Sequence, residues 1–455
     1  MARRHWPAWA NLPDILDLLR LATPVAISRA AMMLMALTDA IVLGLNATGE
    51  LPYVLNAWLP IGIALGGSWG LLMGVQVITA ELSGKGDDQN SGRVFRRGLY
   101  FAIIIGALAT LLIVPTADSL FTLIKLEAEH AAATAAVTRI LAYGLIGHFV
   151  TTVCSMYLEA LRKPLIVTVI MYGGVLINIV IDLAFVAGWW GMPQMGAEGV
   201  AIATTGTRWL MVVAFLIAVW LMTPAWKPST DAPADEAQRQ YSVGAGTAIS
   251  NMAEWGGFNF TYVIASWIAL EVTTVYGLAV HVMGVAFMLF LGIGTATSVR
   301  VAEKYGVGDM AGARDASFLG IVTTIVSGTV LGLLVVIGQD IIPTLMLDGE
   351  EGTALRPLLA SIMLLTAFAL VFDGLQNVAS MALRAQGVIW LPTIVQFGAY
   401  LMVLLASAYY LGYELNRGAQ GMMEGVIIAS VFAGIGQLYL VITKTARHSR
   451  EPRAA

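Results

Sequence analysis

The feature of this sequence that most constrains its fold is a loop that occurs twice. Residues 81–87 read ELSGKGD and residues 303–309 read EKYGVGD, so one Glu, two Gly and one Asp recur after 222 residues. Two further matches follow in the same order. Residues 160–162 and 382–384 both read ALR, and residues 198–200 and 424–426 both read EGV, the last pair at an offset of 226. The order predicts a duplicated half of about 220 residues, an arrangement typical of secondary transporters.

The composition of the chain indicates a membrane protein. It has 455 residues, 58% hydrophobic and only 12% charged, with a mean hydropathy of +0.79, whereas a soluble domain carries about 25% charged residues. The net charge is −4 and the sequence holds no basic patch, which argues against nucleic-acid binding. Cys154 is the only cysteine, so a disulfide within the chain is excluded.

Twelve apolar stretches approach the roughly 20 residues that a helix needs to cross a bilayer. The limits that we predict are 16–44, 54–79, 98–115, 131–158, 164–187, 197–222, 243–268, 274–298, 316–338, 354–382, 389–411 and 419–443. A polar segment with three prolines separates the sixth from the seventh. We therefore predict a first six-helix lobe at 1–222, a cytoplasmic linker at 223–240, and a second six-helix lobe with a short basic tail at 241–455.

The basic residues indicate the orientation in the membrane. With the N-terminus in the cytoplasm, that side receives most of them: Arg3, Arg4, Lys85, Arg93, Arg96, Arg97, Arg162, Lys163, Lys227, Arg239, Arg300, Lys304, Arg314, Arg384, Lys444, Arg447, Arg450 and Arg453. The outer loops receive little beyond Lys125, Arg356 and Arg417. This asymmetry predicts a multi-pass protein of the inner (plasma) membrane with both termini cytoplasmic. Six spans per half make the two repeats parallel, with substrate between them.

Several short motifs, taken in order, resemble the multidrug and toxic compound extrusion (MATE) family, closest to its NorM-like branch. They are Leu21-Ala22-Thr23-Pro24-Val25, Thr38-Asp39 followed by Gly44, the two Gly-x-Gly-Asp loops, Leu161-Arg162 and Leu383-Arg384, Asn178 with Asp182, and Gly196-Ala197-Glu198-Gly199 with Ala203-Thr204. The resemblance covers nearly the whole chain. It implies an all-α, V-shaped bundle of two lobes, acting as a monomer in membrane lipid. It also implies export of drugs and organic cations, driven by inward sodium or proton flow and needing no cofactor.

Carboxylates within the first six spans are candidates for coupling to such an ion. A charge at the bilayer centre costs at least ~2.5–3.5 kcal/mol, so a carboxylate within a span needs a functional or structural explanation. Asn178 and Asp182 are four apart and share one helix face. The resemblance assigns Asp39, Asn178, Asp182 and Thr204 to a cation site of the first lobe. The alternative is a structural ion pair of Asp39 or Asp182 with Arg208.

The second half carries its own polar set. Glu254 lies in the seventh span, and Asp373 lies in the tenth with Gln376 and Asn377 one turn on. The resemblance assigns Glu254 and Asp373 to a cation site of the second lobe, with sodium as the metal ion that they would bind, and Gln376 and Asn377 would add oxygen ligands to it. The sequence shows no intramembrane cation near Glu254. Which lobe couples, and whether to sodium or to protons, stays open.

Flexible thioethers and aromatic rings suit promiscuous binding of flat apolar cations. Candidate residues for such a cavity are Met32, Met35, Trp255, Phe258 and Met283, although methionines at helical spacing also serve as plain packing. Arg29 departs from the family pattern. It either forms a salt bridge or snorkels, or else it contacts an anionic group in the cleft.

A flippase for a polyprenyl-linked sugar precursor is the alternative function. It would need several cationic groups for a pyrophosphate, and the spans offer Arg29 and Arg208 against four carboxylates. Intramembrane enzymes are not supported, because the chain holds neither a His-Glu-x-x-His array nor a Ser/His pair in a Gly-x-Ser setting. The nucleotide loop of ATP-driven pumps is missing as well.

Overall fold

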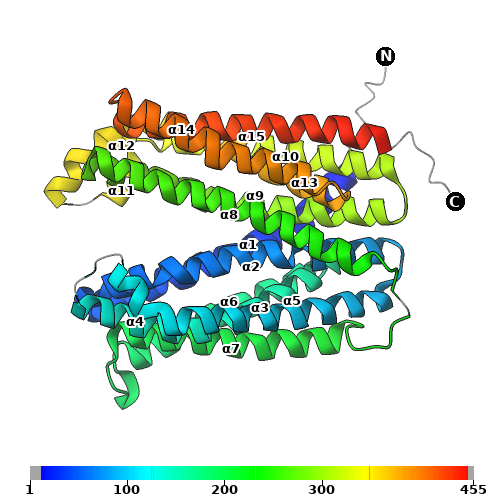
Figure 1. Ribbon diagram of the computed structural model, residues 1–455, viewed down its shortest axis with the longest axis horizontal. Helices are drawn as coiled ribbons and strands as arrows, with labels where there is room; N and C mark the ends of the chain where they lie inside the picture. Colours follow the sequence, from blue (N-terminus) through cyan, green and yellow to red (C-terminus); the bar gives the residue numbers. More distant parts are fainter. Residues whose placement is uncertain (1–11, 124–125, 127, 231, 348, 449–455) are drawn as a thin grey trace. The chain divides into compact units, whose positions relative to one another are not determined.

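The structure, a computed structural model, describes residues 12–123, 126, 128–230, 232–347 and 349–448. Within these ranges every regular element is helical (Figure 1). The first half contains α1 (Leu12–Asn46), α2 (Leu51–Gly84), α3 (Asp88–Leu123), α4 (Ala128–Tyr143), α5 (Leu145–Ala160), α6 (Pro164–Phe185) and α7 (Gly196–Met222). The second half contains α8 (Glu236–Ile268), α9 (Leu270–Gly306), α10 (Met310–Ile337), α11 (Ile341–Met346), α12 (Gly349–Ala385), α13 (Trp390–Phe397), α14 (Leu404–Ala408) and α15 (Gly418–His448).

The predicted all-α integral membrane fold is confirmed, with six long spans in each half. Among the described helices, eleven spans are long and apolar enough to cross a membrane. The remaining predicted span corresponds to α8, which is long but less apolar. Basic residues at five positions that entered the orientation argument lie outside the described residues: Arg3, Arg4, Lys125, Arg450 and Arg453.

Two of the spans are interrupted helices. The fourth span consists of α4 and α5, which meet at Gly144. The eleventh consists of α13, a π-helical turn at Gly398–Val403, α14 and a second π-helical turn at Tyr409–Glu414. A π-helical turn shifts the face on which the following side chains lie, and such turns often occur at functional sites.

The chain forms two compact units. One contains residues 27–248, and the other contains residues 1–26 together with residues 249–455. The first turns of α1 therefore pack with the second half, and the first turns of α8 pack with the first half. We call them the 27–248 unit and the 249–455 unit. The predicted boundaries at 222 and 241 stay a prediction from the sequence.

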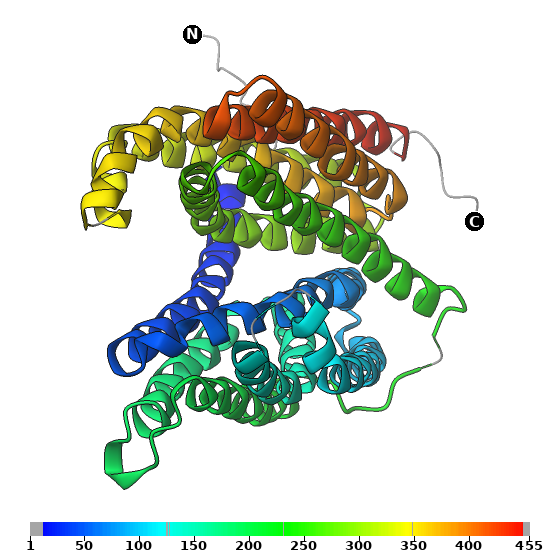
Figure 2. The ribbon, with the colours of Figure 1, turned by 60° about the vertical axis from the view of Figure 1, so that its left-hand side comes forward.

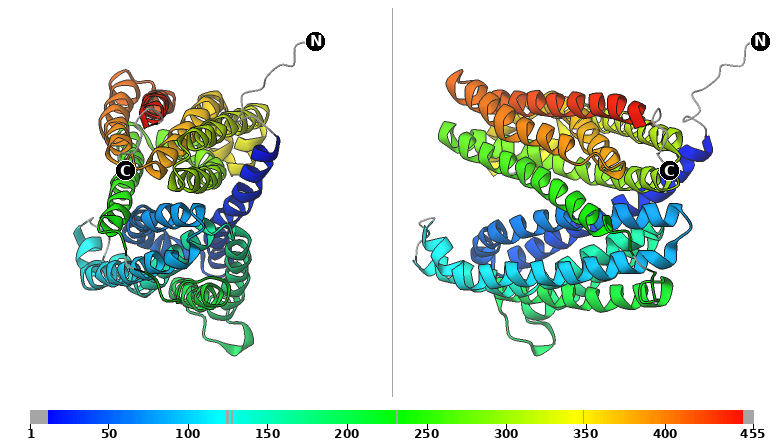
Figure 3. Two further views of the ribbon diagram at one scale, coloured as in Figure 1. Left: turned by 90° about the vertical axis from the view of Figure 1, so that its right-hand side faces the viewer. Right: turned by 45° about the vertical axis from the view of Figure 1, so that its right-hand side comes forward.

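The fourth span of each half, which contains α5 in the first half and is α12 in the second, is the central helix of its unit. In the 27–248 unit, α5 packs against α2, α3 and α7, and nearly all of its side chains are buried. Figure 3 shows the helices of this unit, coloured blue to green, side by side. In the 249–455 unit, α12 packs against α9, α10 and α15. Figure 2 shows α14 and α15, orange and red, lying beside each other at the edge of this bundle.

The outward faces of these helices are apolar, as a lipid environment requires. On α3, Leu108, Leu111 and Leu112 are more than half exposed, and so are Leu333 and Leu334 on α10. Such a density of exposed leucine would be a liability in water. In a bilayer these side chains meet hydrocarbon, while the helical backbone satisfies its own hydrogen bonds.

The repeated Gly-x-Gly-Asp loop has one structure in both halves. Its second glycine adopts a left-handed conformation, with φ of 73° at Gly86 and 81° at Gly308, which a side chain would disfavour. The following aspartate then donates its backbone N–H back into the helix, from Asp87 to Leu82 at 2.9 Å and from Asp309 to Lys304 at 3.0 Å. The motif is therefore a helix stop that turns the chain into the next span.

The Ala-Leu-Arg match is not equivalent in structure. After α5, the left-handed residue is Arg162, and Lys163 N–H bonds to Leu158 O at 2.8 Å. After α12, the left-handed residue is Gly387, and Val388 N–H bonds to a carbonyl five residues back, at 3.0 Å. Arg162 thus corresponds to Gly387 and is exposed, whereas Arg384 lies one turn earlier and is 2% exposed.

Ion pairs and hydrogen bonds join the segment between the halves to α3. Arg93 Nη2 and Arg97 Nη2 contact the Glu236 carboxylate at 2.6 and 3.0 Å. Arg93 Nη1 also donates to Thr230 O at 3.1 Å, and Arg96 Nη2 donates to Ser229 Oγ at 3.1 Å. Burial acts to raise the pKa of Glu236, but the hydrogen bonds and charges of the two arginines outweigh it and lower that pKa.

Candidate cation and substrate sites

The 27–248 unit brings together the four residues predicted for its cation site. Thr204 on α7 donates to Asp39 Oδ2 on α1 at 2.9 Å. On α6, Asn178 Nδ2 donates to Asp182 Oδ2 at 3.2 Å, across one helical turn. The carboxyl groups of Asp39 and Asp182 also lie close enough to interact with each other. We call these residues the first-half site.

Three oxygens of the first-half site lack a partner. They are Oδ1 of Asp39, of Asn178 and of Asp182; each is buried and accepts no hydrogen bond from any residue that the structure describes. Buried polar atoms are nearly always bonded, and leaving one unsatisfied costs ~1–3 kcal/mol. A sodium ion takes oxygen ligands of this hard type, and a proton shared between two adjacent carboxylates would relieve their repulsion.

Arg208 lies close to this site but forms no ion pair within the described part of the chain. It sits one turn after Thr204 on α7 and is 6% exposed. Its charge interacts with Asp39, and its guanidinium lies 5.8 Å from the ring centroid of Trp58. Its Nη1 has no hydrogen-bond partner among the described residues. The predicted alternative, a structural ion pair of Arg208 with Asp39 or Asp182, is therefore not formed in this structure.

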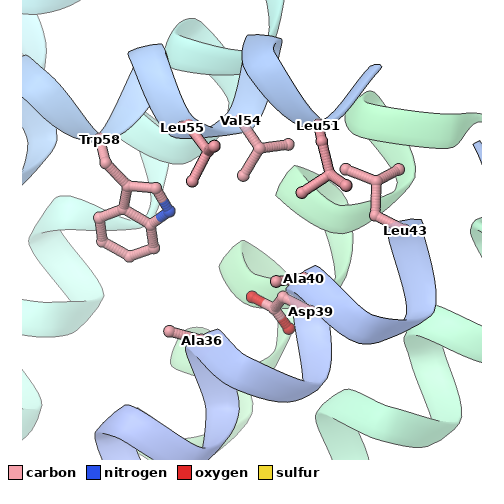
Figure 4. A pocket seen from close by; sticks show the side chains of 8 residues that line it. All are labelled: Ala36, Asp39, Ala40, Leu43, Leu51, Val54, Leu55 and Trp58. Atoms are coloured by element: carbon pink, nitrogen blue, oxygen red, sulfur yellow. The ribbon is translucent and has the colours of Figure 1, made fainter. Parts of the chain in front are cut away.

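An apolar pocket adjoins Asp39 (Figure 4). Its volume is about 250 Å³, and it is lined by residues of α1 and α2: Ala36, Asp39, Ala40, Leu43, Leu51, Val54, Leu55 and Trp58. Asp39 is the single charged side chain in this lining. A carboxylate and an indole on otherwise apolar walls suit a cation that carries apolar groups.

The 249–455 unit assembles a second polar cluster. Gln376 Nε2 on α12 donates to Glu254 Oε1 on α8 at 3.1 Å. Tyr400, in the first π-helical turn, donates its hydroxyl to Asp373 Oδ1 at 3.3 Å. The charges of Glu254 and Asp373 lie close enough to interact. We call Glu254, Asp373, Gln376 and Tyr400 the second-half site.

Two features of the second-half site differ from the sequence-based expectation. Asn377 forms no hydrogen bond with these residues, and its Oδ1 faces α9, where a Cβ atom built on Gly294 would lie 3.1 Å from it. A buried cation is also present, because the charge of Arg384 at the end of α12 interacts with Glu254. The sequence had placed Arg384 among the cytoplasmic basic residues, since it stands at a helix end beside a turn.

The predicted cavity residues occupy other positions. Met35 and Met283 are buried in the hydrophobic cores of their units, and Met32 packs against the first of these cores. Phe258 lies 5.8 Å from Tyr400, ring centroid to centroid, and Trp255 is half exposed. None of the five lines the pocket beside Asp39.

The buried arginine of α1 forms a salt bridge. Arg29 Nη2 contacts both carboxylate oxygens of Glu159 on α5, at 2.8 and 3.0 Å. Trp69 of α2 stacks on the guanidinium, 3.9 Å from ring centroid to Cζ, and Gln76 of the same helix donates to Glu159 at 3.4 Å. The salt-bridge interpretation of Arg29 is confirmed.

Sequence reasoning missed Tyr400, Gln396 and Arg384. Gln396 and Tyr400 are polar residues four apart in the otherwise apolar eleventh span, and that spacing was a usable signal. The π-helical turn that orients Tyr400 carries no such signal, because it depends on packing against neighbouring helices.

The chain is similar to known proteins over most of its length. The MatE family model matches residues 24–184 and 247–409. The chain is 32% identical over 436 residues to the probable multidrug resistance protein NorM of Caulobacter vibrioides, covering 94% of this chain and 91% of the relative. It is 26% identical to the multidrug resistance protein MdtK of Pectobacterium atrosepticum, over 97% of each chain.

Solved structures show the same fold. The crystal structure of the eukaryotic MATE transporter AtDTX14 is similar with a TM-score of 0.85 at 19% identity, over 96% of this chain and 98% of that one. The family match covers both halves and includes most of the residues of the two carboxylate sites. The chain belongs to the MatE (multidrug and toxic compound extrusion) family, a family of membrane transporters and not of enzymes, and its relatives include proteins named NorM.

Proposed function

We propose that the protein is a cation-coupled antiporter that exports amphiphilic organic cations from the cytoplasm across the inner membrane. The observation that carries this proposal is the set of three buried, unpartnered oxygens on Asp39, Asn178 and Asp182. They lie beside an apolar pocket whose one charged lining residue is Asp39. A single carboxylate is thus available both to a coupling ion and to a cationic drug.

The shared carboxylate supplies a simple exchange. When the coupling ion, sodium or a proton, binds the first-half site, it neutralises the charge that attracts the drug. The drug and the ion then compete, and a gradient of the ion drives the drug in the opposite direction. The names of the relatives, multidrug resistance proteins, support drugs as the exported class.

The second-half site serves as a second cation site in this proposal. Glu254 and Asp373 bring two interacting carboxylates into one cluster. In both sites one oxygen of each carboxylate accepts a hydrogen bond, here from Gln376 and from Tyr400. In the first-half site the other oxygen of each carboxylate is buried without a partner among the described residues. We therefore assign the main coupling role to the first-half site and a supporting role to the second.

A flippase for a polyprenyl-linked pyrophosphate is less well supported. Of the two arginines counted for that alternative, Arg29 is neutralised by Glu159 in a pair that is nearly inaccessible to solvent. Only Arg208 is then left to face a pyrophosphate, and it lies beside Asp39. Two buried carboxylates against one unpaired arginine make this region electrostatically favourable to cations.

The test is export of ethidium from proteoliposomes under a sodium gradient or a proton gradient imposed separately. Asp39→Asn and Asp182→Asn should each abolish gradient-driven export while the amount of folded protein holds. Asp118→Asn, which changes a 61% exposed carboxylate of α3, is the matched control and should export normally. Normal export by both Asp39→Asn and Asp182→Asn would refute the proposal.

A further inference from the structure

A chain of hydrogen bonds joins Glu254 to Arg384 inside the 249–455 unit. Arg384 Nη2 donates to Gln396 Oε1 at 2.9 Å, Gln396 Nε2 donates to Gln376 Oε1 at 2.7 Å, and Gln376 Nε2 donates to Glu254 Oε1 at 3.1 Å. All four side chains are at most 5% exposed. The two ends are thus connected through two amides that solvent hardly reaches.

Helical spacing builds this chain. Gln376, Ser380 and Arg384 are four residues apart on α12 and so lie along one face. Ser380 also accepts from Arg384 and donates to Gln396 Oε1 at 3.3 Å. On α8, Ser250 stands one turn before Glu254 and accepts from Arg384 Nη2 at 2.6 Å. The arginine is therefore held by two hydroxyls and one amide oxygen.

The arginine sets the direction of every bond in the chain. A guanidinium has donors only, so the group of Gln396 that faces it must be the oxygen. The amide nitrogen of Gln396 then points at Gln376, which must accept the hydrogen bond with its own amide oxygen. This leaves the Gln376 nitrogen as the group that faces Glu254. Reversing either amide would set N–H against N–H in a buried site, at the cost of unsatisfied polar groups.

We propose that Arg384 and Gln396 are positioning residues that hold Gln376 as a hydrogen-bond donor to Glu254, and so withhold its carbonyl oxygen from any metal cation at Glu254 and Asp373. This inference rests on the second-half role in the proposed function. Sodium binds through oxygen lone pairs and gains nothing from an N–H group. The chain thereby weakens sodium binding at the second-half site, and Gln376 is not one of its cation ligands.

The test frees or reverses the amide of Gln376. Gln396→Glu still accepts from Arg384 but offers no N–H, so the Gln376 amide turns its nitrogen to the new carboxylate and its oxygen to Glu254. Gln396→Met removes both groups without adding charge. The control is Gln386→Glu in the turn after α12. The Gln386 amide donates to Ser317 Oγ at 3.0 Å and takes no part in the hydrogen-bond chain.

The readout is the midpoint of thermal unfolding of the purified protein in detergent, titrated with sodium chloride against choline chloride. Both Gln396 variants should lower the half-saturating sodium concentration by about tenfold, the effect of exchanging one hydrogen-bond donor to a charge for an oxygen ligand. Gln386→Glu should keep the wild-type value. Arg384→Gln can present either its amide oxygen or its amide nitrogen to Gln396, so it should lower the half-saturating sodium concentration as Gln396→Met does. Arg384→Lys should lower it less.

Folded Gln396→Met and Arg384→Gln proteins with wild-type sodium response would overturn the proposal. So would a gained response that survives Glu254→Gln in the Gln396→Met background, because sodium would then bind elsewhere. The supporting role of the second-half site in the proposed function fails by a separate result: ethidium export by Glu254→Gln and Asp373→Asn at the wild-type rate removes that site from transport. The sodium titrations still decide how Gln376 is oriented.

Discussion

The ion pair between Arg29 and Glu159 gives the sharpest stability prediction. Both side chains are buried, with exposed fractions of 3% and 0%, and the pair ties α1 to the central helix α5. Glu159→Gln keeps the shape and one acceptor oxygen for Arg29 but removes the balancing charge. Arg29→Met removes the charge from the other side and leaves Glu159 with the long 3.4 Å bond from Gln76.

The magnitude follows from the burial of both partners. Removing one partner of a buried pair costs ~3–5 kcal/mol, because the remaining charge has neither water nor a counter-ion. Glu159→Gln should lie near the lower end, because its oxygen still accepts a hydrogen bond from the guanidinium. The double variant Arg29→Met with Glu159→Leu leaves no charge behind, and it should fall within ~1–2 kcal/mol of wild type since an apolar replacement of such a pair is often neutral.

The assay is reversible unfolding by sodium dodecyl sulfate in mixed micelles, followed by circular dichroism, on wild type, both single variants and the double variant. The double-mutant cycle isolates the interaction between the two residues. A double variant that loses as much unfolding free energy as the two single variants combined would refute the reasoning. Single variants within ~0.5 kcal/mol of wild type, the range of ordinary surface substitutions, would refute it too.

Three further predictions test other parts of the fold. Lys85 and Val307 occupy the same position of the two exposed repeat loops. In a Cys154→Ala background, cysteines at these two positions should both resist an impermeant reagent outside intact cells and both react after permeabilisation. Labelling of only one of them from outside would contradict parallel repeats. Glu236→Gln should expose the linker to chymotrypsin at Trp226 at pH 7. Because the pKa of Glu236 is lowered, the wild-type linker should become open to pepsin, a protease active in acid, only as the pH falls below the usual glutamate value of about 4.3. Gly257→Ala should destabilise the protein by ~1–3 kcal/mol, since its Cβ would lie 2.5 Å from Tyr400 O. The Cβ of Gly256→Ala would meet no atom within 4 Å, so this variant should be neutral. Thermal unfolding in detergent measures both.

The spans were predictable because their physical cause lies along the chain. A bilayer demands about 20 apolar residues and internally satisfied backbone groups, so hydropathy alone finds the helices. The turns at Gly86 and Gly308 were found as a repeat, and their left-handed glycines explain why the motif recurs. The helix breaks at Gly144 and at the two π-helical turns were not found, because they depend on contacts between helices.

The first-half site was predictable residue by residue, whereas the second was predictable only in part. Asp39, Asn178, Asp182 and Thr204 meet as the family resemblance implied. Arg384 was assigned to the cytoplasm because a charge at a helix end normally reaches water. Its burial depends on Ser250 of α8 and Gln396 of α13, and contacts between helices cannot be read from a hydropathy pattern.

The internal repeat itself explains why one half does not predict the site of the other. At the offset of 222 that relates the two Gly-x-Gly-Asp loops, Asp39 corresponds to Thr261. At the offset of 225 that relates Arg162 to Gly387, Asp182 corresponds to Ser407. Asn178 corresponds at the offset of 225 to Val403, so none of these three residues meets a member of the second-half site. Duplication preserved the turns, which every six-helix half needs. Each half carries one carboxylate on its first span, α1 or α8, but the other lies on the fifth span of the first half, α6, and on the fourth span of the second half, α12, so each half had to acquire its own arrangement of charges.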